Sequence, residues 1–169
     1  MRSWLITCVV ALTVSCTGNA GDERPEGTGP PAELEEATVT RVVDGDTIHV
    51  LLDGRDTTIR IIGIDTPEKD GPFTDEECFG REASDYTTRA LDGVSVGLEF
   101  DVERTDRYDR TLAYVWIGDE LFDERIVRDG VAVLLTIPPN VRYVDRLTAA
   151  QTAARNDGVG LWGSCSTEG

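Results

Sequence analysis

The chain has few of the nitrogen and sulfur side chains that build metal centres. Among its 169 residues there is one histidine, His49, and there are four cysteines, none of them in a Cys-x-x-Cys pair. A structural zinc site takes about four such ligands, so the composition argues against zinc. His49 stands on an expected strand, and we interpret it as a residue of the sheet surface rather than as an acid–base catalyst.

Long apolar runs and positive charge are also scarce. The apolar run at residues 5–14 is too short to span a bilayer as a helix. The formal net charge is −16, and it becomes −17 if residues 1–15, which hold one arginine and no acid, are removed. A surface of this sign gives a polyanion little long-range attraction, so such a ligand would have to be held by a local cation and local arginines.

The first 35 residues have the composition of the leader and linker of an exported chain. A positive start, a short apolar run and a small residue before Cys16 are typical of a signal peptide at residues 1–15. Residues 12–16, Leu-Thr-Val-Ser-Cys, resemble a bacterial lipobox, whose cysteine carries lipid after cleavage; the alternative is an ordinary signal peptide cleaved nearby. Residues 16–35 are rich in Gly, Pro, Asp and Glu, which predicts a flexible linker anchored to a membrane through Cys16.

Two cysteines remain once Cys8 leaves with the signal peptide and Cys16 carries lipid. In an oxidising compartment Cys78 and Cys165 can form a disulfide; the alternative is a pair of free thiols. The bridge would enclose 86 residues and stabilise the fold by about 4 kcal/mol in the chain-entropy model. It would tie the segment before the first expected helix to the C-terminal tail, residues 165–169.

Residues 36–164 form the expected folded domain, because a chain of this length with 40% apolar content can bury one core but hardly two. Runs rich in β-branched residues, bounded by turn-forming Asp-Gly pairs, predict strands. Strands are expected over residues 39–43, 47–52, 57–64, 94–103 and 111–116, with a short strand over 131–135. Helical composition or spacing predicts helices over residues 82–91, 121–128 and 141–155. This order suits an α+β fold, a five-stranded OB-fold barrel with three peripheral helices.

Carboxylates and arginines gather on the expected strands and the loops that follow them. The turn at residues 44–47 reads Asp-Gly-Asp-Thr, and the next strand carries Arg60 and then the run Asp-Thr-Pro-Glu at residues 65–68. Arg110 ends a later loop, residues 105–110. Carboxylates suit a hard cation and planar guanidinium groups suit a phosphate, so the pattern predicts a phosphodiesterase site.

With these motifs the sequence resembles a known family, the staphylococcal-type thermonucleases, which are calcium-dependent nucleases with an OB-fold. The resemblance covers about residues 37–162 and consists of separate motifs in a fixed order. They lie at residues 43–47, 60–68, 80–84, 105–110, 112–114 and 127–130. It implies an extracellular endonuclease that cleaves single-stranded DNA and RNA and leaves 3′-phosphate ends. The oligomeric state is open, with a monomer as the default.

The residue types and the resemblance agree on the roles at the site. Calcium ligands are expected from Asp46, Asp65 and the backbone carbonyl of Thr66, with Asp44 in an outer shell. Glu68 is the expected general base, or alternatively the group that orients the attacking water. Arg60 and Arg110 are expected to bind the phosphate through paired hydrogen bonds. Arg107 and Tyr108 are candidate substrate contacts, and Tyr108 is alternatively a loop aromatic that covers the barrel edge.

Strand geometry poses a test of this arrangement. Arg60 and Asp65 are five residues apart, so strict alternation would place them on opposite faces of one strand. A bulge or bend must therefore intervene, and we place it at Gly63, the residue type most tolerant of such a distortion.

The chain also departs from the family pattern. The loop at residues 69–77 is acidic where the staphylococcal enzyme is lysine-rich, and residues 134–139 lack the tyrosines that stack on a base. Taken singly, Arg60 could pair with a carboxylate on a strand, and residues 65–68 could be a helix-capping turn. The alternative function is a catalytically weak or inactive OB-fold binding module; a calcium-storing surface protein is more remote. Retention of all the catalytic residue types favours the enzyme.

Overall fold

A computed structural model of the chain describes residues 29–69 and 75–165. The predicted signal peptide, the lipidated Cys16 and most of the predicted linker lie outside these residues. Within the described part of the chain, no helix is long and apolar enough to cross a membrane.

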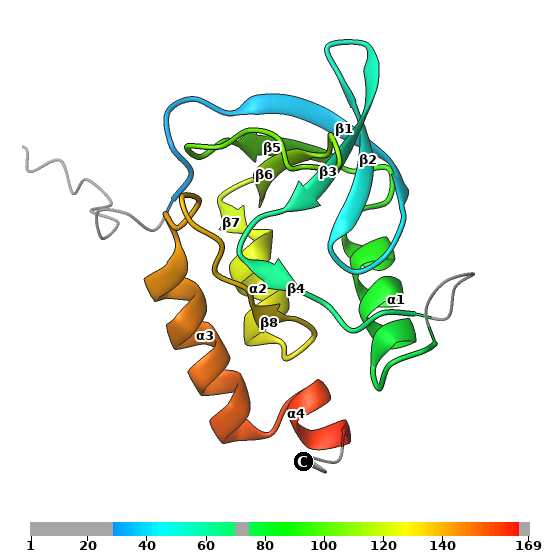
Figure 1. Cartoon of the computed structure of the whole chain (residues 1–169), viewed down its shortest axis with the longest axis vertical. Coiled ribbons are helices and arrows are strands. Elements are labelled where there is room, and N and C mark those ends of the chain that lie inside the picture. The colour runs from blue at the N-terminus through cyan, green and yellow to red at the C-terminus, as the bar shows by residue number, and fades with distance from the viewer. Residues whose placement is uncertain (1–28, 70–74, 166–169) are drawn as a thin grey trace, which may run out of the picture.

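Five strands close into a barrel (Figure 1). They are β1 (Glu35–Val42), β2 (Thr47–Leu52), β3 (Arg55–Ile61), β5 (Ser95–Glu99) and β6 (Thr111–Ile117). Their order in the sheet is β3-β2-β1-β5-β6, and a parallel pairing of β3 with β6 closes the ring. A short strand, β7 (Glu120–Leu121), extends β6 as a hairpin. The predicted five-stranded OB-fold is therefore confirmed.

Alternation of side chains along the strands explains the barrel core. Val39 on β1, Ile48 and Val50 on β2, and Ile59 and Ile61 on β3 are each at most 1% exposed and pack in one cluster. Since neighbouring strand residues face opposite sides, each strand places every second residue inside. The β-branched runs seen in the sequence are thus the inner wall of the barrel.

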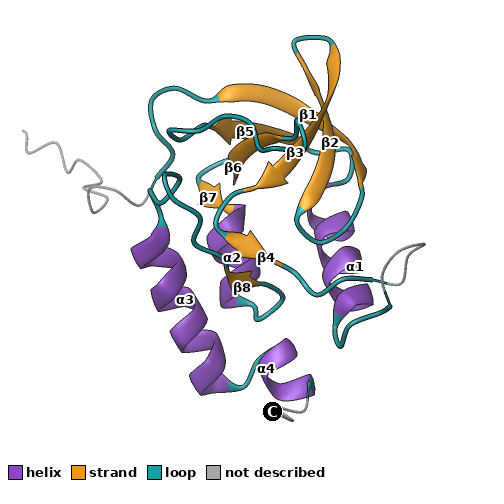
Figure 2. Ribbon diagram, in the orientation of Figure 1, coloured by secondary structure: helices purple, strands orange, loops and turns teal. Residues whose placement is uncertain are grey.

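The helices gather at the other end of the molecule, as Figure 2 shows. They are α1 (Gly80–Leu91), α2 (Phe122–Arg128), α3 (Val144–Asp157) and the four-residue α4 (Leu161–Ser164). Ala83 of α1, Ile126 of α2 and Leu147 of α3 are each at most 1% exposed and belong to the main core. The three predicted helices are confirmed, with ends shifted by up to three residues; α4 was not predicted.

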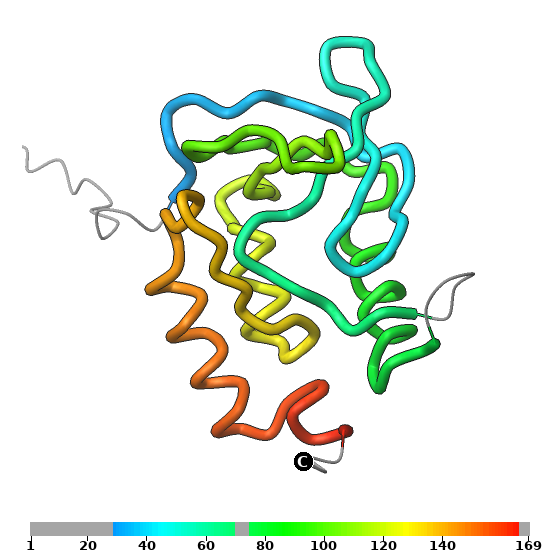
Figure 3. Tube along the Cα trace, viewed as in Figure 1, coloured from blue at the N-terminus to red at the C-terminus, as the bar shows by residue number. Residues whose placement is uncertain are grey.

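One predicted strand is wrong as a continuous element. The strand expected over residues 57–64 ends at Ile61, and the chain turns at Ile62–Gly63, where Gly63 has a φ of 79°. The next strand, β4 (Ile64–Asp65), leaves the barrel and pairs with β8 (Val133–Leu134) in a separate two-stranded sheet. The bulge or bend expected at Gly63 is therefore present as a turn that ends one strand before the next begins. Figure 3 shows the chain running from β4 toward α1.

Candidate active site

The turn between β1 and β2 carries the first two carboxylates. The Asp44 carboxylate accepts a hydrogen bond from the N–H of Asp46 at 3.1 Å, which shapes the turn. Gly45 lies so close to the next segment that an added Cβ would stand 2.5 Å from Thr66 Oγ1. The Thr87 hydroxyl of α1 donates to the Gly45 carbonyl at 2.7 Å. The turn is thus held between Thr66 and α1.

Asp46 is buried and fully engaged. Its Oδ2 accepts from the N–H and the hydroxyl of Thr66 at 3.0 and 3.1 Å, and its Oδ1 lies 3.1 Å from Arg60 Nε. Burial raises the pKa of Asp46 to about 6; the Arg60 charge opposes this rise, and the negative charges of Asp44 and Asp65 add to it. The carboxylate therefore lies in a place where negative charge is costly and a cation is favoured.

Arg60 bridges the carboxylates. Its Nη1 donates to the carbonyls of Ile61 and Ile64, both at 2.8 Å, and its Nη2 donates to Asp65 Oδ1 at 2.9 Å. The break at Ile62–Gly63 turns the chain back on itself, which brings these two carbonyls to one side of the guanidinium. The same break places Arg60 and Asp65 together, which a continuous strand would not do.

The predicted metal ligands lie in one neighbourhood, because Asp46 and Asp65 share the Arg60 guanidinium and Thr66 binds Asp46. Over residues 29–69 and 75–165, no three carboxylate, imidazole or thiol groups are arranged to hold a metal ion. The predicted set contains two carboxylates and one backbone carbonyl, so it does not depend on such a trio. These hard oxygen donors fit calcium better than a softer metal.

Glu68 is an exposed residue of the segment between β4 and α1. Its pKa is raised by partial burial and then by the negative charges of Asp44, Glu77 and Asp65, while Arg60 acts in the opposite direction. Four carboxylates, those of Asp44, Asp46, Asp65 and Glu68, thus share one region. A divalent cation would offset their mutual repulsion, which is a second reason why the site fits such an ion.

The loop between β5 and β6 presents the second arginine. Asp106 accepts from the backbone N–H groups of Tyr108 and Arg110 at 2.9 and 3.0 Å, and from Arg110 Nε at 2.8 Å. Burial acts against them, but these hydrogen bonds lower the pKa of Asp106. Asp106 therefore holds Arg110 in place. We did not assign it a role from the sequence, although its i, i+4 spacing from Arg110 was a signal.

A cavity of about 480 Å³ joins the two arginines. Arg60 and Arg110 both line it, together with Arg107, Tyr108 and apolar side chains. These apolar side chains include Leu112, Leu135 and Ile137. Tyr108 is 64% exposed and lies beneath the Arg107 guanidinium, whose Cζ is 4.7 Å from the ring centre. Arg60 thus touches the cavity on one side and the carboxylates on the other.

His49 takes part in a different group of side chains. Its ring lies 2.8 Å from Arg41 Nη2 and 3.2 Å from Asp56 Oδ1, on strands β1 and β3. These contacts agree with its interpretation as a residue of the sheet surface.

The described part of the chain combines a closed OB barrel with two arginines at one cavity and carboxylates bound to one of these arginines, Arg60. The sequence profile described as "Staphylococcal nuclease homologue" matches residues 58–164. Thermonuclease of Staphylococcus hyicus is 38% identical over 158 residues, 94% of this chain and 93% of that protein. Thermonuclease of Staphylococcus intermedius is 42% identical over 128 residues, 76% of each chain.

A more distant relative is endonuclease YncB of Bacillus subtilis (strain 168), which is 33% identical over 132 residues, 77% of this chain and 63% of that protein. The chain belongs to the staphylococcal nuclease family. The resemblance seen in the sequence motifs is therefore confirmed.

Proposed function

We propose that this protein is a calcium-dependent, extracellular endonuclease that hydrolyses the phosphodiester bonds of DNA and RNA and leaves 3′-phosphate ends. As a member of its family, the chain is a hydrolase of the thermonuclease type. The observation that carries the proposal is the cavity lined by Arg60 and Arg110, because the carboxylates of Asp46 and Asp65 bind Arg60 directly behind it.

Calcium is assigned to the carboxylates of Asp46 and Asp65 and the carbonyl of Thr66, with Asp44 as an outer neighbour. All are oxygen donors, as calcium requires. When bound, the ion would polarise a phosphoryl oxygen and offset negative charge in the transition state.

The protein groups divide the rest of the reaction between them. Arg60 and Arg110 donate hydrogen bonds to the phosphate, where negative charge grows as the nucleophile adds. Glu68 takes a proton from the attacking water, and its raised pKa makes it a stronger base than an ordinary carboxylate. Arg107 and Tyr108, at the rim of the cavity, contact the nucleotides of the substrate.

The disulfide and the leader support the proposed compartment. Cys78 and Cys165 are bonded, with their Cα atoms 5.9 Å apart, so the disulfide prediction is confirmed. Disulfides persist outside the cytosol, which supports export. We assign residues 1–15 to a signal peptide and Cys16 to a lipid anchor, so that the nuclease domain acts as a monomer at a membrane surface.

Hydrolysis of single-stranded DNA by the purified chain tests the function. We expect cleavage with calcium and none with chelator, and a loss of roughly 10²–10⁴-fold in Glu68→Gln and Arg110→Ala. Arg104→Ala is the matched control, because Arg104 lies on the same loop but pairs with Glu35 at 2.8 Å. A wild-type chain that binds calcium yet cuts nothing at any salt or pH would be a binding module instead.

A further inference from the structure

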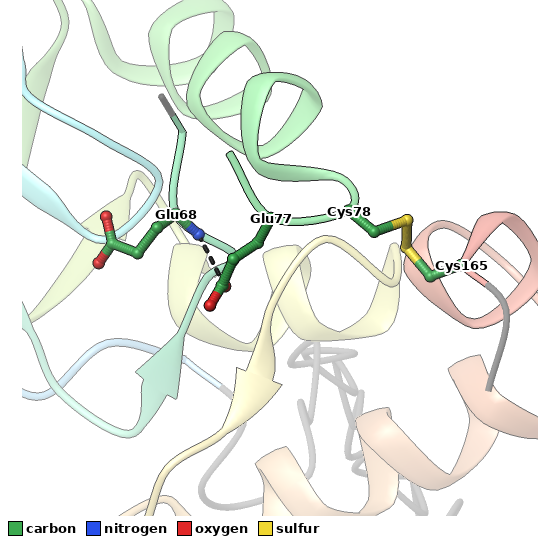
Figure 4. The surroundings of a disulfide bond; sticks show 4 residues. All are labelled: Glu68, Glu77, Cys78 and Cys165. Atoms are coloured by element: carbon green, nitrogen blue, oxygen red, sulfur yellow. Dashed lines mark hydrogen bonds between the residues drawn. A yellow bond between two sulfur atoms is a disulfide. The ribbon is translucent and has the colours of Figure 1, made fainter. Parts of the chain in front are cut away.

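We propose that Glu77, anchored by the adjacent Cys78–Cys165 disulfide, positions Glu68 for the reaction through its hydrogen bonds to the Glu68 backbone. This inference rests on the proposed function, since it assigns a support to the general base of that site. Figure 4 shows the four residues: Glu77 lies between Glu68 and the bridge. Glu77 and the two cysteines touch no reacting atom, so they are positioning residues.

Glu68 and Glu77 are joined by a reciprocal pair of hydrogen bonds. The N–H of Glu68 donates to Oε2 of Glu77 at 3.0 Å, and the N–H of Glu77 donates to the carbonyl of Glu68 at 2.9 Å. Both main-chain polar groups of Glu68 are therefore satisfied by one residue. The first bond is assisted by the charge of the carboxylate, which makes it stronger than a neutral one.

The first turn of α1 packs against this pair of residues. A Cβ on Gly80 would overlap the carbonyl of Glu68, so the helix start and the segment are in direct contact. The Gly80 N–H donates to the carbonyl of Glu77 at 3.0 Å, and Lys69 Nζ donates to Ser84 Oγ at 3.1 Å. The position of Glu68 thus depends on where Glu77 meets α1.

The disulfide extends this support to the opposite helices. Cys165 follows α4, and its N–H donates to the carbonyl of Leu161 at 3.0 Å. The Leu161 N–H in turn donates to the carbonyl of Gly130 at 2.8 Å, just past the end of α2. A covalent connection therefore runs from Glu77, through Cys78 and Cys165, to helices that lie away from α1.

Such a support matters because the Glu68 side chain is exposed and its carboxylate is repelled by neighbouring negative charges. Asp44, Asp65 and Glu77 all place negative charge near its carboxylate. A general base must stay within hydrogen-bond reach of the water it deprotonates. A misplacement of about 1 Å can cost on the order of 10²-fold in rate. The bonds to Glu77 hold the backbone of Glu68 in place.

The first test separates the hydrogen bond from the charge. In Glu77→Ala we expect kcat to fall about tenfold with KM within about twofold, because substrate binding does not involve Glu77. Glu77→Gln keeps an acceptor oxygen and should restore most of the loss. Glu76→Ala is the control, because the neighbouring Glu76 carboxylate pairs with Arg81 at 3.1 Å rather than with Glu68. The kcat of Glu76→Ala should stay at the wild-type value.

The second test addresses the bridge. In the double variant Cys78→Ser/Cys165→Ser we expect kcat to fall severalfold, measured well below the Tm of each protein. Adding Glu77→Ala to this double variant should lower kcat by a smaller factor than Glu77→Ala does in the wild type, because both changes act through one segment. Dithiothreitol, which gives up two electrons and two protons to form two thiols, should lower wild-type kcat but not that of the double variant. A lower Tm with unchanged kcat would mean that the bridge only stabilises.

A readout without substrate keeps the two proposals apart. Hydrogen exchange at the Glu68 N–H should speed up in Glu77→Ala and in the double serine variant, and stay slow in Glu76→Ala. If the wild type cuts DNA while Glu77→Ala changes neither kcat nor this exchange, the positioning role is refuted and the nuclease stands. If the wild type cuts nothing with calcium, both proposals fail.

Discussion

Arg60 shows how much of this site depends on the shape of one side chain. The guanidinium makes contacts in four directions: two backbone carbonyls, Asp46 and Asp65. It also lines the cavity, so it connects the carboxylates to the position we assign to the phosphate. A planar fork can serve several acceptors at once, whereas an ammonium group acts as a point charge.

We therefore expect Arg60→Lys to lower kcat/KM by about 10²–10³-fold although the charge is kept. Steady-state hydrolysis of a single-stranded oligonucleotide measures this fall in kcat/KM. Arg55→Lys, at an exposed position on the same strand, is the control and should match the wild type. Equal activity of Arg60→Lys and wild type would remove Arg60 from transition-state binding.

Asp123 is a residue whose titration should affect stability. It is fully buried at the start of α2; Oδ2 accepts from the Val115 N–H at 3.0 Å, and Oδ1 has no hydrogen-bond partner among the described residues. Burial raises its pKa well above the ordinary value. A carboxyl group whose pKa is higher in the folded state favours folding below its unfolded pKa, and this contribution is lost as pH rises through the folded pKa.

Asp123→Asn mimics the neutral form, so its stability relative to wild type should increase with pH. We expect a relative gain of about 1–3 kcal/mol between mildly acidic and alkaline pH, the cost of an unsatisfied buried group. Urea unfolding at both pH values measures this difference. Asp75→Asn, at an exposed position, should show no such trend, and an equal trend in the two variants would contradict the assignment.

At the scale of elements, the turn at residues 44–47 and the segment at residues 65–68 form one unit. Gly45 allows them to meet, because a side chain there would run into Thr66. The contact sets the two hydrogen bonds from Thr66 to Asp46, and hence the place of the first expected calcium ligand. Neither segment alone would define the site.

Gly45→Ala should therefore weaken calcium binding by about tenfold or more and cost about 1–3 kcal/mol of stability. Calcium titration calorimetry and urea unfolding provide the two measurements. Gly54→Asn serves as the control: a side chain at Gly54 meets open space, and asparagine tolerates its φ of 75°. Unchanged calcium affinity in Gly45→Ala would show that the ion does not use Asp46.

Elements were predictable to different degrees. The strands β1, β2 and β6 and the three main helices follow from periodicity and Asp-Gly boundaries, which act over a few residues. The end of β3 was missed because Ile61, Ile62 and Ile64 are all strand-forming types. Only the pairing of β4 with β8, about seventy residues later in the chain, decides that the strand breaks there.

At the scale of the whole molecule, the net charge of −16 sets the response to salt. Most nucleic-acid-binding proteins lose affinity as salt rises, because counterions are released from the phosphates. Here, added salt also screens the repulsion between an acidic surface and a polyanion. The two effects oppose each other.

We expect the KM for an oligonucleotide to change by less than about twofold between about 20 and 150 mM KCl at constant calcium. Asp75→Lys combined with Glu76→Lys, which places positive charge on the loop before α1, should lower KM at low salt and restore a steep salt dependence. A steep rise of the wild-type KM with salt would show that local arginines dominate over the net charge.

The sequence by itself determined the inner wall of the barrel, the main helices and the chemical types at the site, because these depend on periodicity, turn residues and short motifs. Tertiary structure decided which groups meet: Arg60 with Asp46 and Asp65, Thr66 with Asp46, and Thr87 of α1 with the turn at Gly45. Such contacts join separate turns and strands. They form only when the barrel closes and the helices pack, which no local pattern encodes.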